Sequence, residues 1–323
     1  MRGQLFSLLD IPFPSYFVLL LTGFLFATAL GALWAKRIGQ DPDVIVDLGI
    51  AMLIAGVAGA RLLHVFADGK FWDYVHLCTD PAKVDWKITE QECRTSYEGL
   101  WDAARGVCHP ATKPGLGDAI GRCFAWAMFW QGGLAYYGGF VAASVTAWYV
   151  LRRDRFPFWK AADMAGMVLP LGLGFGRMGC LLGGCCFGRV TDVPWALVFP
   201  PNSAASQAQF ERSLLPLPSE PSLPVHPTQL YESLGSLVLA FGLVLWLHGR
   251  KRYDGQVFLC FVVGYAVLRF VLEVWRDDDR GGLFGLSTSQ LVGLALVVVA
   301  ALAHRRLGAR AFGRPGSTPA VPS

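Results

Sequence analysis

Seven stretches of this sequence are apolar for long enough to cross a lipid bilayer, and they restrict the fold more than any other feature. A span needs about 20 predominantly apolar residues. The bilayer core offers the backbone no outside hydrogen-bond partner, so such segments must be helices rather than an open sheet. Composition agrees, because 54% of the 323 residues are hydrophobic and only 16% are charged. We predict an all-α integral membrane protein with seven transmembrane helices at about 15–35, 44–66, 125–151, 161–182, 228–247, 255–275 and 284–303.

The basic residues predict the orientation of these spans. Lys and Arg collect in cytoplasmic loops, and here every basic cluster follows an odd-numbered span, at 36–37, 152–160, 250–252 and 305–314. This pattern places the N-terminus outside and the C-terminus in the cytoplasm. We expect one polytopic domain over 1–312 and a disordered tail over 313–323, where Gly, Pro and Ser leave little to bury.

A long insert, 67–124, joins the second and third predicted spans on the external side. It contains Cys78, Cys93, Cys108 and Cys123. An even number of cysteines in an oxidising compartment predicts two disulfides, and their spacing leaves all three pairings open. Free thiols are a less favoured alternative. A zinc site is weaker still, because the insert has no CxxC spacing.

Charged side chains occur inside several predicted spans, where each costs roughly 2.5–3.5 kcal/mol. Arg61 lies in the second span and Arg177 in the fourth. In and just after the sixth span, four polar residues step by four, four and three positions and so share one helix face. They are Tyr265, Arg269, Glu273 and Arg276.

The excess of arginine over carboxylate in these spans predicts an anion-binding site. A pair between Arg269 and Glu273, with Arg276 reaching the headgroup region, is the simpler alternative. That alternative leaves Arg61 and Arg177 unexplained. A phospholipid phosphate suits them, because the guanidinium fork matches phosphate with two hydrogen bonds.

Motifs along most of the chain resemble those of the bacterial phosphatidylglycerol–prolipoprotein diacylglyceryl transferase family. HPTQLYE at 226–232 together with GRMG at 176–179 is the most specific combination. The other matching segments are Tyr16 ahead of Gly23, GAR at 59–61, QGGLAYYGG at 131–139, GF at 174–175, GRV at 188–190, FP at 199–200, GY at 264–265 with the three charged residues that follow, and 287–290.

This resemblance implies a transferase of the bacterial inner membrane that carries out the first step of lipoprotein maturation. The lipobox cysteine of a preprolipoprotein would receive the diacylglyceryl group of phosphatidylglycerol, with thioether formation and release of glycerol phosphate. The implied partners are phosphatidylglycerol, preprolipoprotein signal peptides and membrane lipids. No cofactor, metal or nucleic acid is expected.

The resemblance also implies roles for individual residues. Arg177 and Arg269 match the two principal arginines and are the expected catalytic residues, acting on the phosphate. The expected substrate-binding residues are Tyr16, Arg61, Tyr137, Gly138, Gly139, Gly188, Tyr265, Glu273 and Arg276.

The sequence departs from the family pattern beside Arg177. The signature continues with asparagine and glutamate, where this chain has Cys180, Gly183 and Cys185, followed by Cys186. Tyr137 stands where the family often has histidine, which excludes a histidine base at that position. The cysteines have three interpretations, in order of preference: small core residues, an external disulfide, and metal ligands, the last disfavoured because no histidine cluster completes a set.

Two other functions fit the same features. A membrane transporter or flippase would bind lipid through these arginines without reacting, and a paralogue would keep the fold with another acceptor. Detection of a covalent lipid product on a peptide separates the transferase from the transporter.

Overall fold

A computed structural model describes residues 4–8, 11–67, 71–80, 83–84, 90, 93, 99–109, 123–127, 135–277, 282–283 and 285–312. Its contacts group the chain into two compact units. The larger combines Met1–Val46 with Asp154–Ser323, and the smaller is Asp47–Arg153. The predicted disordered tail, 313–323, lies outside the described residues.

Six helices among the described residues are long and apolar enough to cross a membrane, which confirms the all-α membrane class. Two of these spans change helix type near one end: α9 continues through a π-helical and a 3-10 turn, and α10 through a 3-10 turn. The spans are α1 (Ser15–Arg37), α2 (Pro42–Ala67), α7 (Phe158–Gly183), Thr228–Arg250 (α9 Thr228–Phe241, η4 Gly242–Leu247, η5 His248–Arg250), Gln256–Trp275 (α10 Gln256–Leu272, η6 Glu273–Trp275) and Thr288–Ala311 of α11 (Thr288–Phe312).

The third predicted span, 125–151, is not among these six. Its described part holds a 3-10 turn, η2 (Ala125–Ala127), and the helix α6 (Tyr136–Arg153). Residues 128–134 lie outside the described residues. The 18 residues of α6 begin with two tyrosines and end with two arginines, which leaves its apolar stretch shorter than those of the six.

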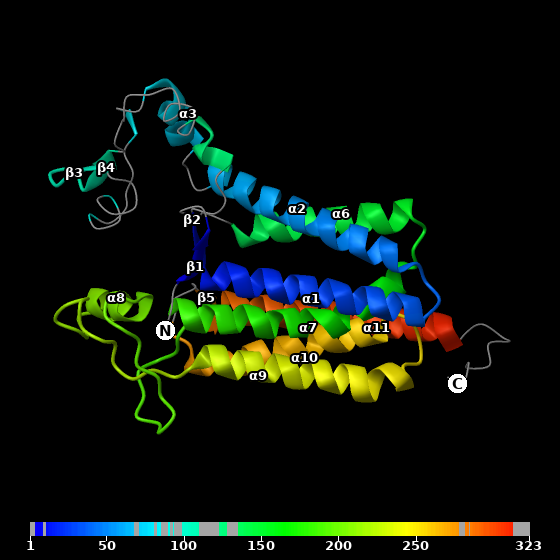
Figure 1. The fold of residues 1–323 in the computed structure, drawn as a ribbon. Helices are drawn as coiled ribbons and strands as arrows, with labels where there is room; N and C mark the ends of the chain where they lie inside the picture. The colour runs from blue at the N-terminus through cyan, green and yellow to red at the C-terminus, as the bar shows by residue number, and fades with distance from the viewer. Residues whose placement is uncertain are drawn as a thin grey trace. The chain divides into compact units, whose positions relative to one another are not determined.

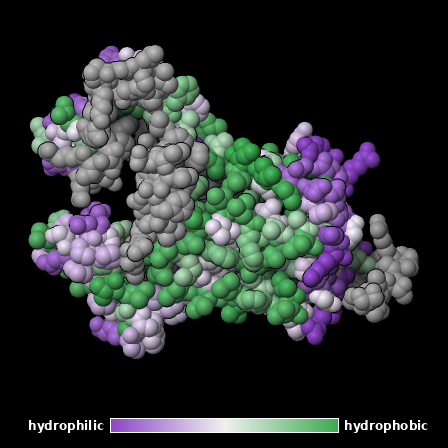
Figure 2. Space-filling view, in the orientation of Figure 1, coloured by the Kyte–Doolittle hydropathy of each residue, from purple (hydrophilic) through white to green (hydrophobic). Residues whose placement is uncertain are grey.

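The larger unit is a bundle of α1, α7, α9, α10 and α11, which run alongside one another (Figure 1). α7 contacts α1, α9 and α10, and α11 packs on α10. Large apolar side chains such as Leu25, Leu245 and Val299 are exposed on the outside of this bundle. Figure 2 shows hydrophobic residues covering the helical midsection of the visible face, with hydrophilic residues where helices end. This distribution suits a surface that faces lipid.

Short elements extend from the helices of the larger unit. Two antiparallel strand pairs and one short helix are among these elements, and the hydrophobic pattern does not predict them. They are β1 (Gln4–Leu8) with β2 (Ile11–Pro14), β5 (Gly282–Leu283) with β6 (Leu286–Ser287), and α8 (Ala204–Glu211) in the segment between α7 and α9.

A buried carboxylate joins the N-terminal ends of α7 and α10. Asp163 accepts hydrogen bonds from the backbone N–H of Val257 at 2.9 Å and of Phe258 at 3.2 Å. It also pairs with Lys251 Nζ at 2.8 Å. Burial acts to lower the pKa of Lys251, but hydrogen bonds to Asp163 and Asp254 raise it above its ordinary value. Asp163 therefore supplies both a helix cap and an ion pair.

In the smaller unit, α2 and α6 cross at glycines. A side chain at Gly138 would lie 2.3 Å from the carbonyl oxygen of Gly59, and one at Gly59 would lie 2.6 Å from that of Gly138. Such close approach of two helix backbones is the usual role of small residues in membrane proteins.

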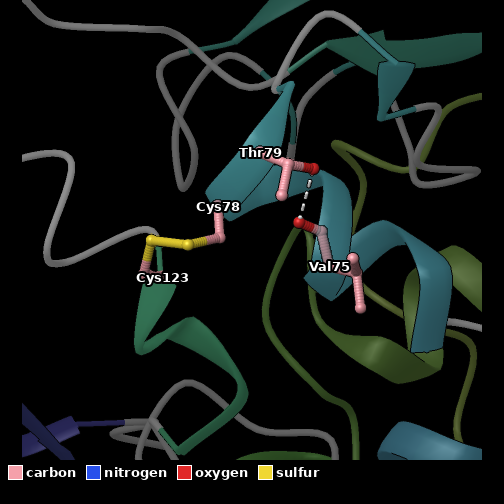
Figure 3. The surroundings of a disulfide bond; sticks show 4 residues. All are labelled: Val75, Cys78, Thr79 and Cys123. Atoms are coloured by element: carbon pink, nitrogen blue, oxygen red, sulfur yellow. Dashed lines mark hydrogen bonds between the residues drawn. A yellow bond between two sulfur atoms is a disulfide. The ribbon is translucent and has the colours of Figure 1, made fainter.

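The four cysteines of the insert form two disulfides, as predicted. The structure pairs Cys78 with Cys123 and Cys93 with Cys108. Figure 3 shows the first, at the end of α3 (Phe71–Thr79), where the Thr79 hydroxyl donates to the Val75 carbonyl at 3.0 Å. The second includes Cys108 of a hairpin between β3 (Leu100–Asp102) and β4 (Val107–His109).

Candidate active site

Three arginines of the larger unit converge on one buried carboxylate, Glu232 of α9, whose side chain is 1% exposed. Arg177 of α7 lies 3.0 Å from Oε1. Arg276 and Arg269 lie 3.7 and 4.0 Å from Oε2. Tyr265 donates its hydroxyl to Oε1 at 2.8 Å. Three of the four polar residues predicted to share one helix face therefore meet Glu232, although the helical span ends at Trp275 and Arg276 has extended backbone, so Arg276 does not belong to that face.

The fourth residue of that face, Glu273, pairs with Arg269 at 3.1 Å. The cluster thus holds three guanidinium groups against two carboxylates, Glu232 and Glu273. Arg269 Nη1 is buried and makes no hydrogen bond within the described part of the chain. Glu232 Oε2 lies 4.0 Å from this atom, beyond hydrogen-bond distance, and also makes no hydrogen bond among the described residues. A buried donor left without a hydrogen bond is costly. The arrangement therefore suits an added anion that would accept from Arg269.

The HPTQLYE segment attaches the start of α9 to its surroundings. Thr228 Oγ1 donates to the Cys186 carbonyl and Gln229 Nε2 to the Cys185 carbonyl, both at 2.8 Å. The Tyr231 hydroxyl accepts from Trp195 Nε1 at 2.6 Å. These contacts fix α9 at the end of α7, so the motif positions Glu232 against Arg177.

Gly188 lies where three segments meet. Its N–H donates to the His226 carbonyl at 2.9 Å, and it pairs with Arg276 in an isolated β-bridge. A side chain here would lie 2.5 Å from the Trp275 carbonyl oxygen. Glycine at this position lets the backbone that carries Arg276, whose side chain is 2% exposed, reach the cluster.

Tyr16 lies at the start of α1 and is partly exposed. Its backbone packs against Gly179, where an added side chain would lie 3.0 Å from the Tyr16 Cα. Its hydroxyl lies within electrostatic reach of Arg177 and of Cys180. The structure therefore places Tyr16 beside the arginine cluster.

The Cys186 thiol, just beyond the end of α7, is electrostatically part of the same region. Hydrogen bonds with the Cys180 and Cys185 thiols lower the pKa of Cys186, and the nearby Arg177 and Arg276 guanidinium groups lower it further.

The remaining predicted site residues belong to the smaller unit. Arg61 is buried and donates to the carbonyls of Trp126 at 2.7 Å and Ala125 at 2.8 Å, and to the Tyr74 hydroxyl at 3.1 Å. The guanidinium group of Arg61 therefore binds backbone carbonyls of residues 125–126. Gly138 and Gly139 face α2, where a side chain at Gly139 would lie 3.0 Å from the Gly56 carbonyl oxygen, and Tyr137 is 71% exposed.

The family model described as prolipoprotein diacylglyceryl transferase matches residues 4–89 and 120–305. The chain belongs to the prolipoprotein diacylglyceryl transferase family. The match skips 90–119, a part of the predicted insert, and includes every predicted site residue. The family resemblance read from the motifs is therefore confirmed, and the family's members are transferases.

Individual members of the prolipoprotein diacylglyceryl transferase family show how much of the chain is shared. Three similar proteins are named phosphatidylglycerol--prolipoprotein diacylglyceryl transferase. The protein of Clostridium tetani is 26% identical over 93% of this chain and 95% of its own length. That of Glaesserella parasuis is 33% identical over 68% and 79%. That of Corynebacterium diphtheriae is 29% identical over 94% and 90%.

Sequence reasoning on this diacylglyceryl transferase family member missed Glu232 as the centre of the cluster. Arg177 was expected to lack a carboxylate partner, and the structure corrects this with the 3.0 Å contact to Glu232. The signal was present, because Glu232 is an ionisable residue within a predicted span, 228–247. Its partners lie on other helices, so only the packing shows which arginines it meets.

Proposed function

We propose that this chain transfers the diacylglyceryl group of phosphatidylglycerol to the lipobox cysteine of preprolipoproteins. The acceptor sulfur attacks the glyceryl carbon, the bond between that carbon and the phosphate oxygen breaks, and glycerol phosphate leaves. The acceptor gains a thioether and loses its thiol proton. The names of the related proteins and the arginine cluster support this proposal.

The observation that carries the proposal is the buried Nη1 atom of Arg269, which has no hydrogen-bond partner among the described residues. In the proposed complex this atom donates to the lipid phosphate, and Arg177 donates beside it. Negative charge grows on the phosphate oxygen as the bond breaks. Fixed guanidinium groups in a water-poor site stabilise that charge without reorganisation. Arg177 and Arg269 are therefore the proposed catalytic residues.

The proposed substrate-binding residues of the larger unit surround or brace this phosphate position. Glu232 and Tyr265 hold the arginines in place, as their contacts at 3.0 and 2.8 Å indicate. The family resemblance assigns substrate contacts to two groups, Tyr16, Gly188, Tyr265, Glu273 and Arg276 in the larger unit, and Arg61, Tyr137, Gly138 and Gly139 in the smaller.

The proposed setting is the bacterial inner membrane, with seven spans, the N-terminus outside and the C-terminus in the cytoplasm. In addition to the six candidate spans, α6 supplies the third predicted span, 125–151. The basic clusters at the ends of α1, α6 and α11 support this orientation.

The test uses Arg177→Ala and Arg269→Ala, with Arg305→Ala as the control because Arg305 is exposed on α11. Purified variants receive phosphatidylglycerol and a lipobox peptide, and mass spectrometry follows the diacylglyceryl thioether. Loss of one preorganised donor should raise the barrier by about 3 kcal/mol, which is roughly a hundredfold in rate. The control should transfer normally.

Two outcomes would contradict the proposal. Near-normal transfer by Arg177→Ala or Arg269→Ala would remove that residue from the phosphate site. Phospholipid binding by the wild-type protein without any thioether product would favour a lipid transporter instead.

A further inference from the structure

Three cysteine thiols lie together at the end of α7. The Sγ atoms of Cys180, Cys185 and Cys186 are all within 4.8 Å of one another. Cys180 is buried and the other two are partly buried. The four cysteines of the insert are in disulfides. Of the four free cysteines, three form this cluster and the fourth, Cys260, lies in α10.

The backbone brings the thiols together through the turn that follows α7. The N–H of Cys185 donates back to the Cys180 carbonyl at 3.1 Å. Cys186 has a φ of 61°, in the left-handed region that non-glycine residues rarely adopt. This conformation turns the chain sharply, so that two consecutive cysteines can both approach Cys180.

Side chains of α9 hold this turn. Thr228 and Gln229 donate to the carbonyls of Cys186 and Cys185, each at 2.8 Å. Both donors are buried. Metal sites depend on such outer contacts to orient their ligands before the ion arrives.

Two guanidinium groups lie near the sulfur cluster. Arg177 and Arg276 both act electrostatically on Cys186, and Arg177 also acts on Cys180. Thiolates are the form that binds metals. Three thiolates carry more negative charge than one bound Zn²⁺ or Cu⁺ ion neutralises. The two nearby guanidinium groups would offset the remaining negative charge.

We propose that Cys180, Cys185 and Cys186 bind one thiolate-preferring metal ion of filled d-shell, such as Zn²⁺ or Cu⁺. With metal–sulfur bonds of about 2.3 Å, the ligand sulfurs of one site are roughly 3.8–4.0 Å apart. The observed separations of up to 4.8 Å need only a small contraction. Three sulfurs complete a trigonal Cu⁺ site, and Zn²⁺ would add one further ligand, such as water. The sequence alone ranked metal binding last, and the sulfur positions are what raise it.

The test measures metal binding by the purified full-length protein. Reduced protein in detergent is incubated with Zn²⁺ or with Cu⁺ and separated from unbound ion, and retained metal is measured by mass spectrometry. The wild type should retain about one ion per chain. Cys180→Ser, Cys185→Ser and Cys186→Ser should each bind about tenfold or more weakly. Cys260→Ser is the matched control and should bind normally.

A second measurement on the wild type avoids any folding defect of the variants. Bound ion should protect Cys180, Cys185 and Cys186 from alkylation, while the modification of Cys260 stays unchanged. Three results would overturn the proposal: no ion retained by the reduced wild type, equal retention by the three serine variants, or a disulfide among the three cysteines in never-reduced protein that contains no metal.

Discussion

At the scale of single residues, Glu232 organises the candidate active site. It brings arginines from α7 and from the α10 region to one point, with its side chain almost fully buried. A buried carboxylate with a single arginine would be satisfied by that pair. Here a second carboxylate, Glu273, still leaves one guanidinium group in excess. Glu232 therefore does not neutralise the cluster, and it holds the arginines ready for an anionic ligand.

Replacing Glu232 with glutamine should both destabilise the protein and impair transfer. The change leaves three arginines, one buried and two partly buried, facing a neutral side chain, and removal of one partner from a buried ion pair typically costs about 3–5 kcal/mol. Thermal unfolding in detergent and thioether formation on a lipobox peptide are the measurements. Glu211→Gln is the control, because Glu211 is exposed at the end of α8. Full activity and wild-type stability of Glu232→Gln would show that the arginines do not depend on this carboxylate.

At the scale of secondary-structure elements, polar contacts at both ends of α7 join it to neighbouring helices. The end of α7 meets the start of α9 through backbone carbonyls of Cys185 and Cys186. The other end of α7 meets the start of α10 through Asp163. Apolar packing between helices in lipid is weakly directional, whereas these hydrogen bonds need defined positions. They therefore set the rotation and depth of α7, which carries Arg177.

Asp163→Asn should lower stability by about 3 kcal/mol, because Lys251 loses its buried partner. Asp254→Asn provides a matched control, since Asp254 pairs with the same Lys251 but has a side chain that is 43% exposed. Its loss should cost about 1 kcal/mol or less. Thermal unfolding of both variants in the same detergent tests the difference. Equal losses would mean that burial of Asp163 contributes nothing to the strength of its contacts.

The disulfide pairing of the insert is a second prediction at this scale. Proteolysis of never-reduced protein should release one linked peptide pair that contains Cys78 and Cys123, and another that contains Cys93 and Cys108. The reason is that the fold of the insert places these pairs together. Mass spectrometry before and after reduction identifies the links. A peptide pair joining Cys78 to Cys93, or free thiols at all four positions, would contradict the pairing.

At the scale of the whole molecule, the number of spans depends on α6. In the part of the chain that the structure describes, six helices are long and apolar enough to cross a membrane, and α6 is shorter. If α6 spans, the insert and the segment after Arg153 lie on opposite sides. If it does not, they lie on the same side. The arginines at the end of α6 favour a cytoplasmic location for that end.

Reporter fusions should resolve this topology. A reporter within 67–124 should be active outside, whereas reporters placed after Arg155 and after Ser323 should be cytoplasmic. The expectation rests on the basic residues that follow every odd-numbered predicted span. Activity of the first two reporters on the same side would show that α6 does not cross the membrane. A cytoplasmic insert would overturn the predicted orientation. A fusion after Arg37, the last residue of α1, provides the cytoplasmic reference, because the last turn of α1 is basic.

The sequence could predict features that depend on local length, composition and spacing. Five of the six candidate spans begin and end within about three residues of the predicted limits, because lipid requires an uninterrupted apolar helix of bilayer length. The last, predicted at 284–303, begins later at Thr288 and continues to Ala311. The shared face of Tyr265, Arg269 and Glu273 follows from helical periodicity alone. The even number of cysteines in the insert predicted two disulfides. The sequence motifs predicted the family.

Only the tertiary structure decided which distant residues meet. The partners of Glu232 come from other segments of the chain, such as Arg177 of α7. The sequence of a mostly apolar helix does not show which of its faces packs against which neighbour. The disulfide pairing depended on the path of the insert, since equal spacing makes no pairing special. The three thiols near Arg177 meet because one turn has left-handed backbone geometry and α9 holds its carbonyls.

The sequence by itself determined the membrane helices and the family, because those follow from neighbours along the chain. The arginine cluster and the sulfur cluster required packing in three dimensions, because their atoms come together only when separate segments fold against one another.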